Sequence, residues 1–129
     1  MEQVIQDFIS SWSNVNNTWI VVLLCLMAVD MVSGILSSLK DKTTYSSILY
    51  NGIMKKVSII VSLTAIFLID TLFVFDSQLF NVLTLIFCGY ESLSSIENLG
   101  KCGVPFPQWI IDKLYALQDL KPEDKENDE

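Results

Sequence analysis

Three long apolar segments, at residues 19–39, 57–75 and 79–99, constrain the fold of this chain more than any other feature. Each is close to the roughly 20 residues that a helix needs to cross a bilayer. Only backbone with internal hydrogen bonds can cross hydrocarbon, and the sequence lacks the alternating strands of a membrane barrel. We therefore expect an all-α membrane protein with about three transmembrane helices. The third segment is the least apolar, because Glu91 and Glu97 fall in its second half, and it could instead lie at the interface.

The composition fits a membrane protein and excludes most other classes. Hydrophobic residues make up 51% of the 129 positions, and histidine and arginine are absent. Imidazole catalysis, histidine-ligated metals and guanidinium clamps are therefore unavailable, and we expect no enzyme activity. The net charge of −7 leaves no basic face for the phosphates of nucleic acid. Cys25, Cys88 and Cys102 form no C-x-x-C pair, so we expect no disulfide, no metal and no cofactor.

The flanking regions divide the rest of the chain. Residues 1–18 place apolar side chains at helical spacing, which predicts an amphipathic helix on the outer surface or, equally, a frayed terminus. The transmembrane domain follows at residues 19–99. Residues 100–120 contain a turn with two prolines and then an amphipathic helix suited to the inner membrane surface. Residues 121–129 hold five acids and two lysines, which predicts a disordered acidic tail.

The distribution of lysines predicts the topology. Residues 40–56 contain four lysines and one acid, whereas no lysine precedes Trp19. Positively charged loops are retained in the cytoplasm. We therefore predict that the N-terminus lies outside and the 40–56 loop inside, with the C-terminus also inside if the third segment spans.

A carboxylate, Asp30, lies in the middle of the first apolar segment. A charge at that depth costs about 2.5–3.5 kcal/mol on insertion scales, so such residues usually face other helices or water. Small and polar residues recur around it and would let another helix approach closely. This stripe consists of Asp30, Ser33, Gly34, Ser37 and Ser38. It indicates an oligomer interface or a pore lining. The alternative is packing within one chain, with Asp30 protonated or bonded to a serine or threonine.

The second segment has a carboxylate of its own, Asp70, near the predicted outer end. A residue so close to the interface can simply reach the headgroups, and this interpretation is the stronger one. Asp70 stays a weaker candidate for a pore lining.

The third segment carries a polar seam, whose members follow one another by three and four residues. A polar seam is expected on the hidden or wet side of a membrane helix, which indicates self-association or a water-lined path. For residues 91–98 the alternative is a polar side that faces the cytoplasm. The seam consists of Asn81, Thr84, Cys88, Glu91, Ser95, Asn98 and Cys102.

Several of these residues belong to a pattern that resembles the phage-lysis and toxin-secretion holins, of which the clostridial toxin-secretion holins are the best-known members. The similarity covers roughly residues 20–115 and is most specific in the stretch ESLSSIENLGKCGVPFP. The residues that carry the motif are Lys56, Glu91, Ser92, Asn98, Cys102, Gly103, Pro105 and Pro107.

The resemblance implies a small protein of the bacterial cytoplasmic membrane that forms homo-oligomers and opens lesions. A cell-wall hydrolase (endolysin) or a large protein toxin would pass through them. The resemblance leaves an antiholin role open. A hypothesis from a different functional class is also open. In it, the chain is a small accessory or scaffold subunit that forms no hole.

Overall fold

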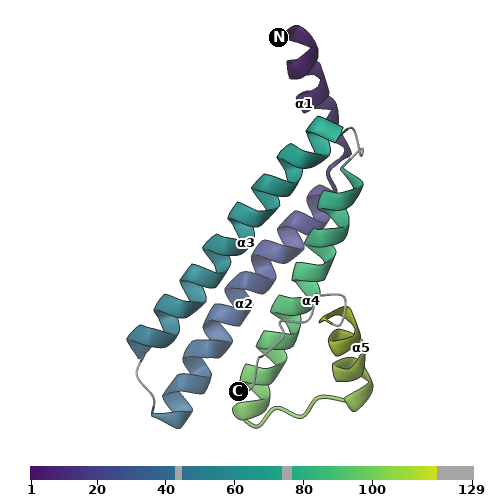
Figure 1. The fold of residues 1–129 in the computed structure, drawn as a ribbon. Helices are drawn as coiled ribbons and strands as arrows, with labels where there is room; N and C mark the ends of the chain where they lie inside the picture. The colour runs from purple at the N-terminus through teal and green to yellow at the C-terminus, as the bar shows by residue number, and fades with distance from the viewer. Residues whose placement is uncertain (43–44, 74–76, 119–129) are drawn as a thin grey trace, which may run out of the picture.

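The computed structural model of this protein describes residues 1–42, 45–73 and 77–118. The described residues contain five helices and no strand (Figure 1). The helices are α1 (Glu2–Asn14), α2 (Asn17–Asp41), α3 (Tyr45–Phe73), α4 (Gln78–Lys101) and α5 (Gln108–Gln118). The predicted all-α class is confirmed, whereas the predicted acidic tail at 121–129 lies outside the described residues.

Three of the described helices, α2, α3 and α4, are long and apolar enough to cross a membrane, as predicted. They lie side by side, and α3 runs antiparallel to the other two (Figure 1). The contact between α2 and α4 is the most extensive in the bundle. Although the third segment was the least apolar, α4 has 24 residues and meets the length that a span requires.

The second span starts earlier than the sequence pattern predicts. Residues 40–56 were expected to form a loop, but α3 begins at Tyr45 and continues through most of this region. No proline interrupts it, and a single glycine, Gly52, costs a helix only about 1 kcal/mol. Lys55 and Lys56 therefore lie within a long helix rather than in a loop. Of the four lysines used for the topology prediction, only Lys40 and Lys42 lie at the end of the bundle.

Local backbone signals set the ends of two spans. The Asn16 side chain accepts a hydrogen bond from Trp19 N at 3.4 Å and caps the start of α2. After α4, Gly103 adopts a φ of 96°, a conformation that favours glycine, and Val104 N donates to Leu99 O at 3.1 Å. The chain reverses at this turn, so that α5 packs beside α4 (Figure 1).

The apolar core lies in the half of the bundle near α1, which contacts the adjoining end of α3. Phe67 is central to it. Its ring makes edge-to-face contacts with Phe8, Trp12 and Phe80 at centroid distances of 5.3, 5.7 and 5.9 Å. The buried core consists of Val15, Leu23, Met27, Ile59, Leu63, Phe67, Phe80 and Cys88.

Large apolar side chains also cover the outer surface of the bundle. Exposed members occur on all three long helices, as lipid contact requires. They include Val21, Leu24, Val32, Ile53, Val57, Val61, Leu68, Val82 and Leu85. The outer surface of the bundle is therefore largely apolar, as a surface in contact with lipid should be.

Candidate functional site

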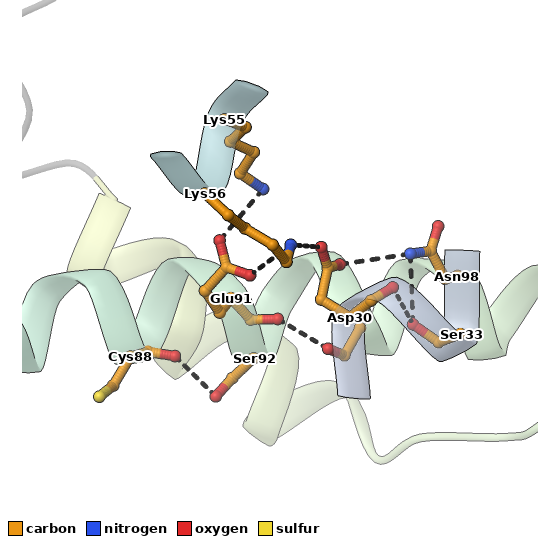
Figure 2. Close-up of polar contacts among 9 residues, drawn as sticks. Asp30, Ser33, Lys55, Lys56, Cys88, Glu91, Ser92 and Asn98 are labelled. Atoms are coloured by element: carbon orange, nitrogen blue, oxygen red, sulfur yellow. Dashed lines mark hydrogen bonds and ion pairs between the residues drawn. The ribbon is translucent and has the colours of Figure 1, made fainter. Parts of the chain in front are cut away.

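A cluster of four charged side chains joins the three long helices inside the bundle. The Lys56 ammonium of α3 donates to Asp30 Oδ2 of α2 at 2.6 Å and to Glu91 Oε2 of α4 at 3.0 Å (Figure 2). Lys55 Nζ lies 3.5 Å from Glu91 Oε1 and 4.0 Å from the centre of the Tyr90 ring. We call Asp30, Lys55, Lys56 and Glu91 the ion cluster.

The ion cluster is buried, and its formal charges cancel. The side chains of Asp30, Lys56 and Glu91 are 9%, 8% and 0% exposed, whereas Lys55 is 28% exposed. Two carboxylates balance two ammonium groups, so that no net charge is buried. Each isolated ion would cost several kcal/mol in so apolar an environment, and pairing with direct hydrogen bonds offsets much of that cost. The charges of α2 and α4 are therefore compensated only while both helices stay in contact with α3.

A polar network extends the ion cluster along the interface between α2 and α4. Asn98 Nδ2 donates to Asp30 Oδ1 at 3.4 Å and to Ser33 Oγ at 3.3 Å (Figure 2). The Ser33 hydroxyl donates to the Asp30 carbonyl at 3.0 Å. A Cβ placed on Gly34 would meet Asn98 Nδ2 at 3.6 Å, which is ordinary contact. The Asp30 carboxylate is therefore held by an ion pair with Lys56 and by the Asn98 amide.

The stripe on α2 and the polar seam on α4 face each other within one chain. Ser33, Ser37 and Ser38 are buried on α2, and the Ser38 hydroxyl bonds to the Gly34 carbonyl at 2.8 Å. On α4, the buried seam residues are Thr84, Cys88, Glu91 and Ser95. The cytoplasm-facing alternative for residues 91–98 does not hold for Glu91 and Ser95, because both side chains are buried.

The two ends of the seam contact other parts of the chain. Asn81 accepts from Asn16 N at 2.8 Å and donates to the Asn14 carbonyl at 3.2 Å. It therefore fixes the connection between α1 and α2. Cys102 follows the end of α4 and is half-buried in the turn toward α5.

Asp70 does not reach the headgroups, although the sequence favours that interpretation. Its side chain is fully buried, and Oδ2 accepts a hydrogen bond from Phe80 N at 2.7 Å. The first N–H groups of a helix have no partner within that helix, and this carboxylate satisfies one of them for α4. Ser77, just before α4, donates to the Ser11 carbonyl at 2.6 Å. Asp70 thus joins the end of α3 to the start of α4.

One further polar contact joins α5, which lies outside the spans, to the last turns of α4. The Tyr115 hydroxyl donates to Glu97 Oε1 at 3.2 Å. This hydrogen bond and the carboxylate charge raise the pKa of the exposed tyrosine above its usual value. Among the described residues, no group of three or more His, Cys, Asp or Glu side chains is placed to hold a metal ion.

The comparison with known families decides what kind of membrane protein carries this cluster. The model of the bacteriophage holin family matches residues 7–119, which is most of the chain. The chain belongs to the bacteriophage holin family. The resemblance seen in the sequence is therefore confirmed, and a holin role is supported.

Individual relatives agree with this assignment. A probable holin of Bacillus phage phi105 is 26% identical over 84% of this chain and 80% of its own length. The uncharacterized protein CPE0383 of Clostridium perfringens is 32% identical over 78% of this chain and 75% of its own length. The uncharacterized protein YqxH of Bacillus subtilis is 28% identical over 82% of this chain and 76% of its own length. No solved structure matches this holin.

The motif residues of this holin fall into two groups. Lys56, Glu91 and Asn98 meet in or beside the ion cluster, while Ser92 bonds to the Cys88 carbonyl at 2.8 Å (Figure 2). The second group forms the reversal between α4 and α5 and consists of Cys102, Gly103, Pro105 and Pro107.

Sequence reasoning missed the role of the two lysines. From the sequence, both lysines are expected in the 40–56 loop, where they serve only the topology prediction, and Lys56 also belongs to the family motif. One signal was present in the sequence. Two unpaired carboxylates in neighbouring spans require cations at similar depth, and Lys55 and Lys56 directly precede the second apolar segment.

Proposed function

We propose that this holin forms homo-oligomers in the bacterial cytoplasmic membrane and opens lesions. A cell-wall hydrolase or a large protein toxin would pass through these lesions. The observation that carries the proposal is the ion cluster, which places four charges of three helices inside a bundle with an apolar exterior. Such a bundle can sit closed in lipid and still contain the side chains that a water-filled lesion needs.

The closed and open states would use the same polar side chains in different ways. In the closed bundle, Lys55 and Lys56 together neutralise Asp30 and Glu91, and the stripe on α2 covers the seam on α4. Separation of the helices would expose these charges, which is costly in lipid but favourable in water. Opening is therefore feasible only where several copies separate together and share a water-filled space. Three helices enclose too little space for a protein, so the lesion requires an oligomer.

The proposed topology places the N-terminus outside and both the α2–α3 connection and the C-terminus in the cytoplasm. Lys40, Lys42 and Lys101 lie at the helix ends on the side of that connection, against Asp41. The Lys40 ammonium donates to the Lys101 carbonyl at 2.8 Å, so that two of these lysines are near each other. Cations at one end of a bundle favour its retention in the cytoplasm.

Inducible expression of this chain alone tests the proposal. Viable count and the release of a co-expressed cytoplasmic cell-wall hydrolase are followed in time, with membrane accumulation measured by immunoblot. We expect abrupt killing and hydrolase release after a delay. A membrane that stays tight at high accumulation would contradict the proposal and favour the accessory subunit. In that case, delayed killing by a co-expressed lytic holin would identify an antiholin.

A further inference from the structure

A cavity lined by both polar and apolar side chains lies in one half of the bundle. Its volume is about 440 Å³, and it lies between α2, α3 and α4. It extends from Asp41 and Lys101, the last residues of α2 and α4, inward to Asp30 at the ion cluster. Ser38, Lys55 and Asn98 line it between these ends. Four of its lining residues carry formal charges that cancel.

The other half of the bundle has the opposite character. Beyond the ion cluster, the interior is filled by the apolar plug, which we define as Leu23, Met27, Leu63, Phe67 and Phe80. The members of the apolar plug are closely packed, with exposed fractions of 2–8%. The ion cluster therefore lies between the cavity, which Asp30 and Lys55 line, and a packed apolar interior.

We infer that the closed bundle contains a half-channel, a water-filled passage from the α2–α3 end to the Asp30 carboxylate that the apolar plug closes. Nine of the fifteen lining residues are polar or charged and can hydrogen-bond to water, and the cavity has room for on the order of ten molecules. Irregular polar surfaces are tolerated at membrane depth where they line such water. The half-channel admits water and small cations from one side only. Opening a lesion then requires wetting of the apolar plug, because the ion cluster already borders water.

Thiol labelling of the closed protein tests the half-channel. Cells are harvested before killing begins and are divided into spheroplasts and inverted membrane vesicles. The probe is a permanently charged methanethiosulfonate carrying a trimethylammonium group, which reacts with accessible thiols and does not cross lipid. A Gly52→Cys variant places a thiol in the cavity, where a Cβ meets no atom within 4 Å. Its native cysteines are replaced by alanine.

Two native cysteines provide matched controls as single-cysteine proteins. Cys102 lies at the same end of the bundle as the cavity mouth and reports the side, whereas Cys88 is buried in the apolar core. We expect Gly52→Cys to react from the same side as Cys102 and within about tenfold of its rate. Cys88 should react about a hundredfold more slowly, because a buried thiol reacts only after local opening.

The outcomes separate cleanly and do not depend on lysis. A thiol at position 52 that reacts as slowly as Cys88 would show that the cavity is dry. Equal rapid reaction of Cys88 would show that water also enters the apolar core, which contradicts closure by the apolar plug. If Gly52→Cys does not accumulate, Ser94→Cys replaces it, because Ser94 also lines the cavity and serine and cysteine are similar in size. Killing is scored in parallel, so failure of the lesion and failure of the half-channel are distinguished.

Discussion

The two halves of this bundle are held closed by different interactions. On the side of the α2–α3 connection, charged and amide side chains from all three helices bond around Lys56. On the side of α1, aromatic and aliphatic side chains pack around Phe67. Buried ion pairs resist separation in lipid but lose their attraction in water, whereas apolar packing in a membrane is weak and reversible. We therefore predict that the polar half holds the helices together in lipid and that the helices separate first in the apolar half.

Removing the cation from the polar half should have the largest effect. Lys56→Leu leaves Asp30 and Glu91 buried without their shared partner, and losing one member of a buried pair costs about 3–5 kcal/mol. We expect much lower membrane accumulation and lower thermal stability in detergent. Lys56→Arg, which keeps the charge, should recover part of both. Wild-type thermal stability of Lys56→Leu would show that the polar half does not hold the three helices together.

Weakening the apolar half should have a smaller effect of a different kind. Phe67→Ala removes three edge-to-face contacts, each worth about 0.5–1.5 kcal/mol. We expect normal accumulation, modest destabilisation and earlier killing, measured as the delay between induction and hydrolase release. The control is Leu68→Ala, which truncates the exposed neighbour of Phe67. A later onset of killing in Phe67→Ala would contradict the prediction that the helices separate first in the apolar half.

Asp70 provides a polar contact within the apolar half. We expect its substitution to reduce the stability of the bundle less than the two substitutions above. Asp70→Ala removes the acceptor for Phe80 N and should destabilise the bundle by about 1–2 kcal/mol, as loss of a helix cap does. Asp70→Asn retains an acceptor oxygen and should lose less. Thermal unfolding in detergent measures both variants. Equal loss in Asp70→Asn and Asp70→Ala would mean that charge, rather than the cap, matters here.

The smallest effect is expected outside both halves, at the exposed contact between α5 and α4. Tyr115→Phe removes the hydrogen bond to Glu97 and should leave accumulation and killing unchanged, because an exposed hydrogen bond contributes little. The raised pKa of Tyr115 means that its phenol stays protonated at pH values at which ordinary tyrosines ionise. Ultraviolet titration of the wild type should show this late component, and Glu97→Gln should shift it to lower pH.

In both halves, the sequence predicted the helices better than the contacts between them. The lengths of the apolar segments and their helical periodicity were enough to predict the three spans and the two short terminal helices, because helix formation depends on local composition. Glu91 and Asp30 were recognised as costly charges for the same reason. Their partner Lys56 was not, since pairing between residues 26 and 35 positions apart is set by packing of separate helices. The cap role of Asp70 likewise depends on where α4 begins relative to α3.

The central claim is that the ion cluster is retained for opening rather than for stability, and one triple variant tests it. Asp30→Leu, Lys56→Leu and Glu91→Leu together remove the buried charges, and replacing a buried ion cluster by apolar side chains is often neutral or stabilising. The matched control places leucine at three lipid-facing valines, one per helix: Val29, Val61 and Val82.

The measurement is hydrolase release per unit of membrane-inserted protein. We predict that the triple variant accumulates like the wild type and releases no hydrolase, while the valine control kills on the wild-type schedule. Release by the triple variant on that schedule would contradict the claim that these charges serve the lesion. Its loss from the membrane would contradict the claim that they are dispensable for stability.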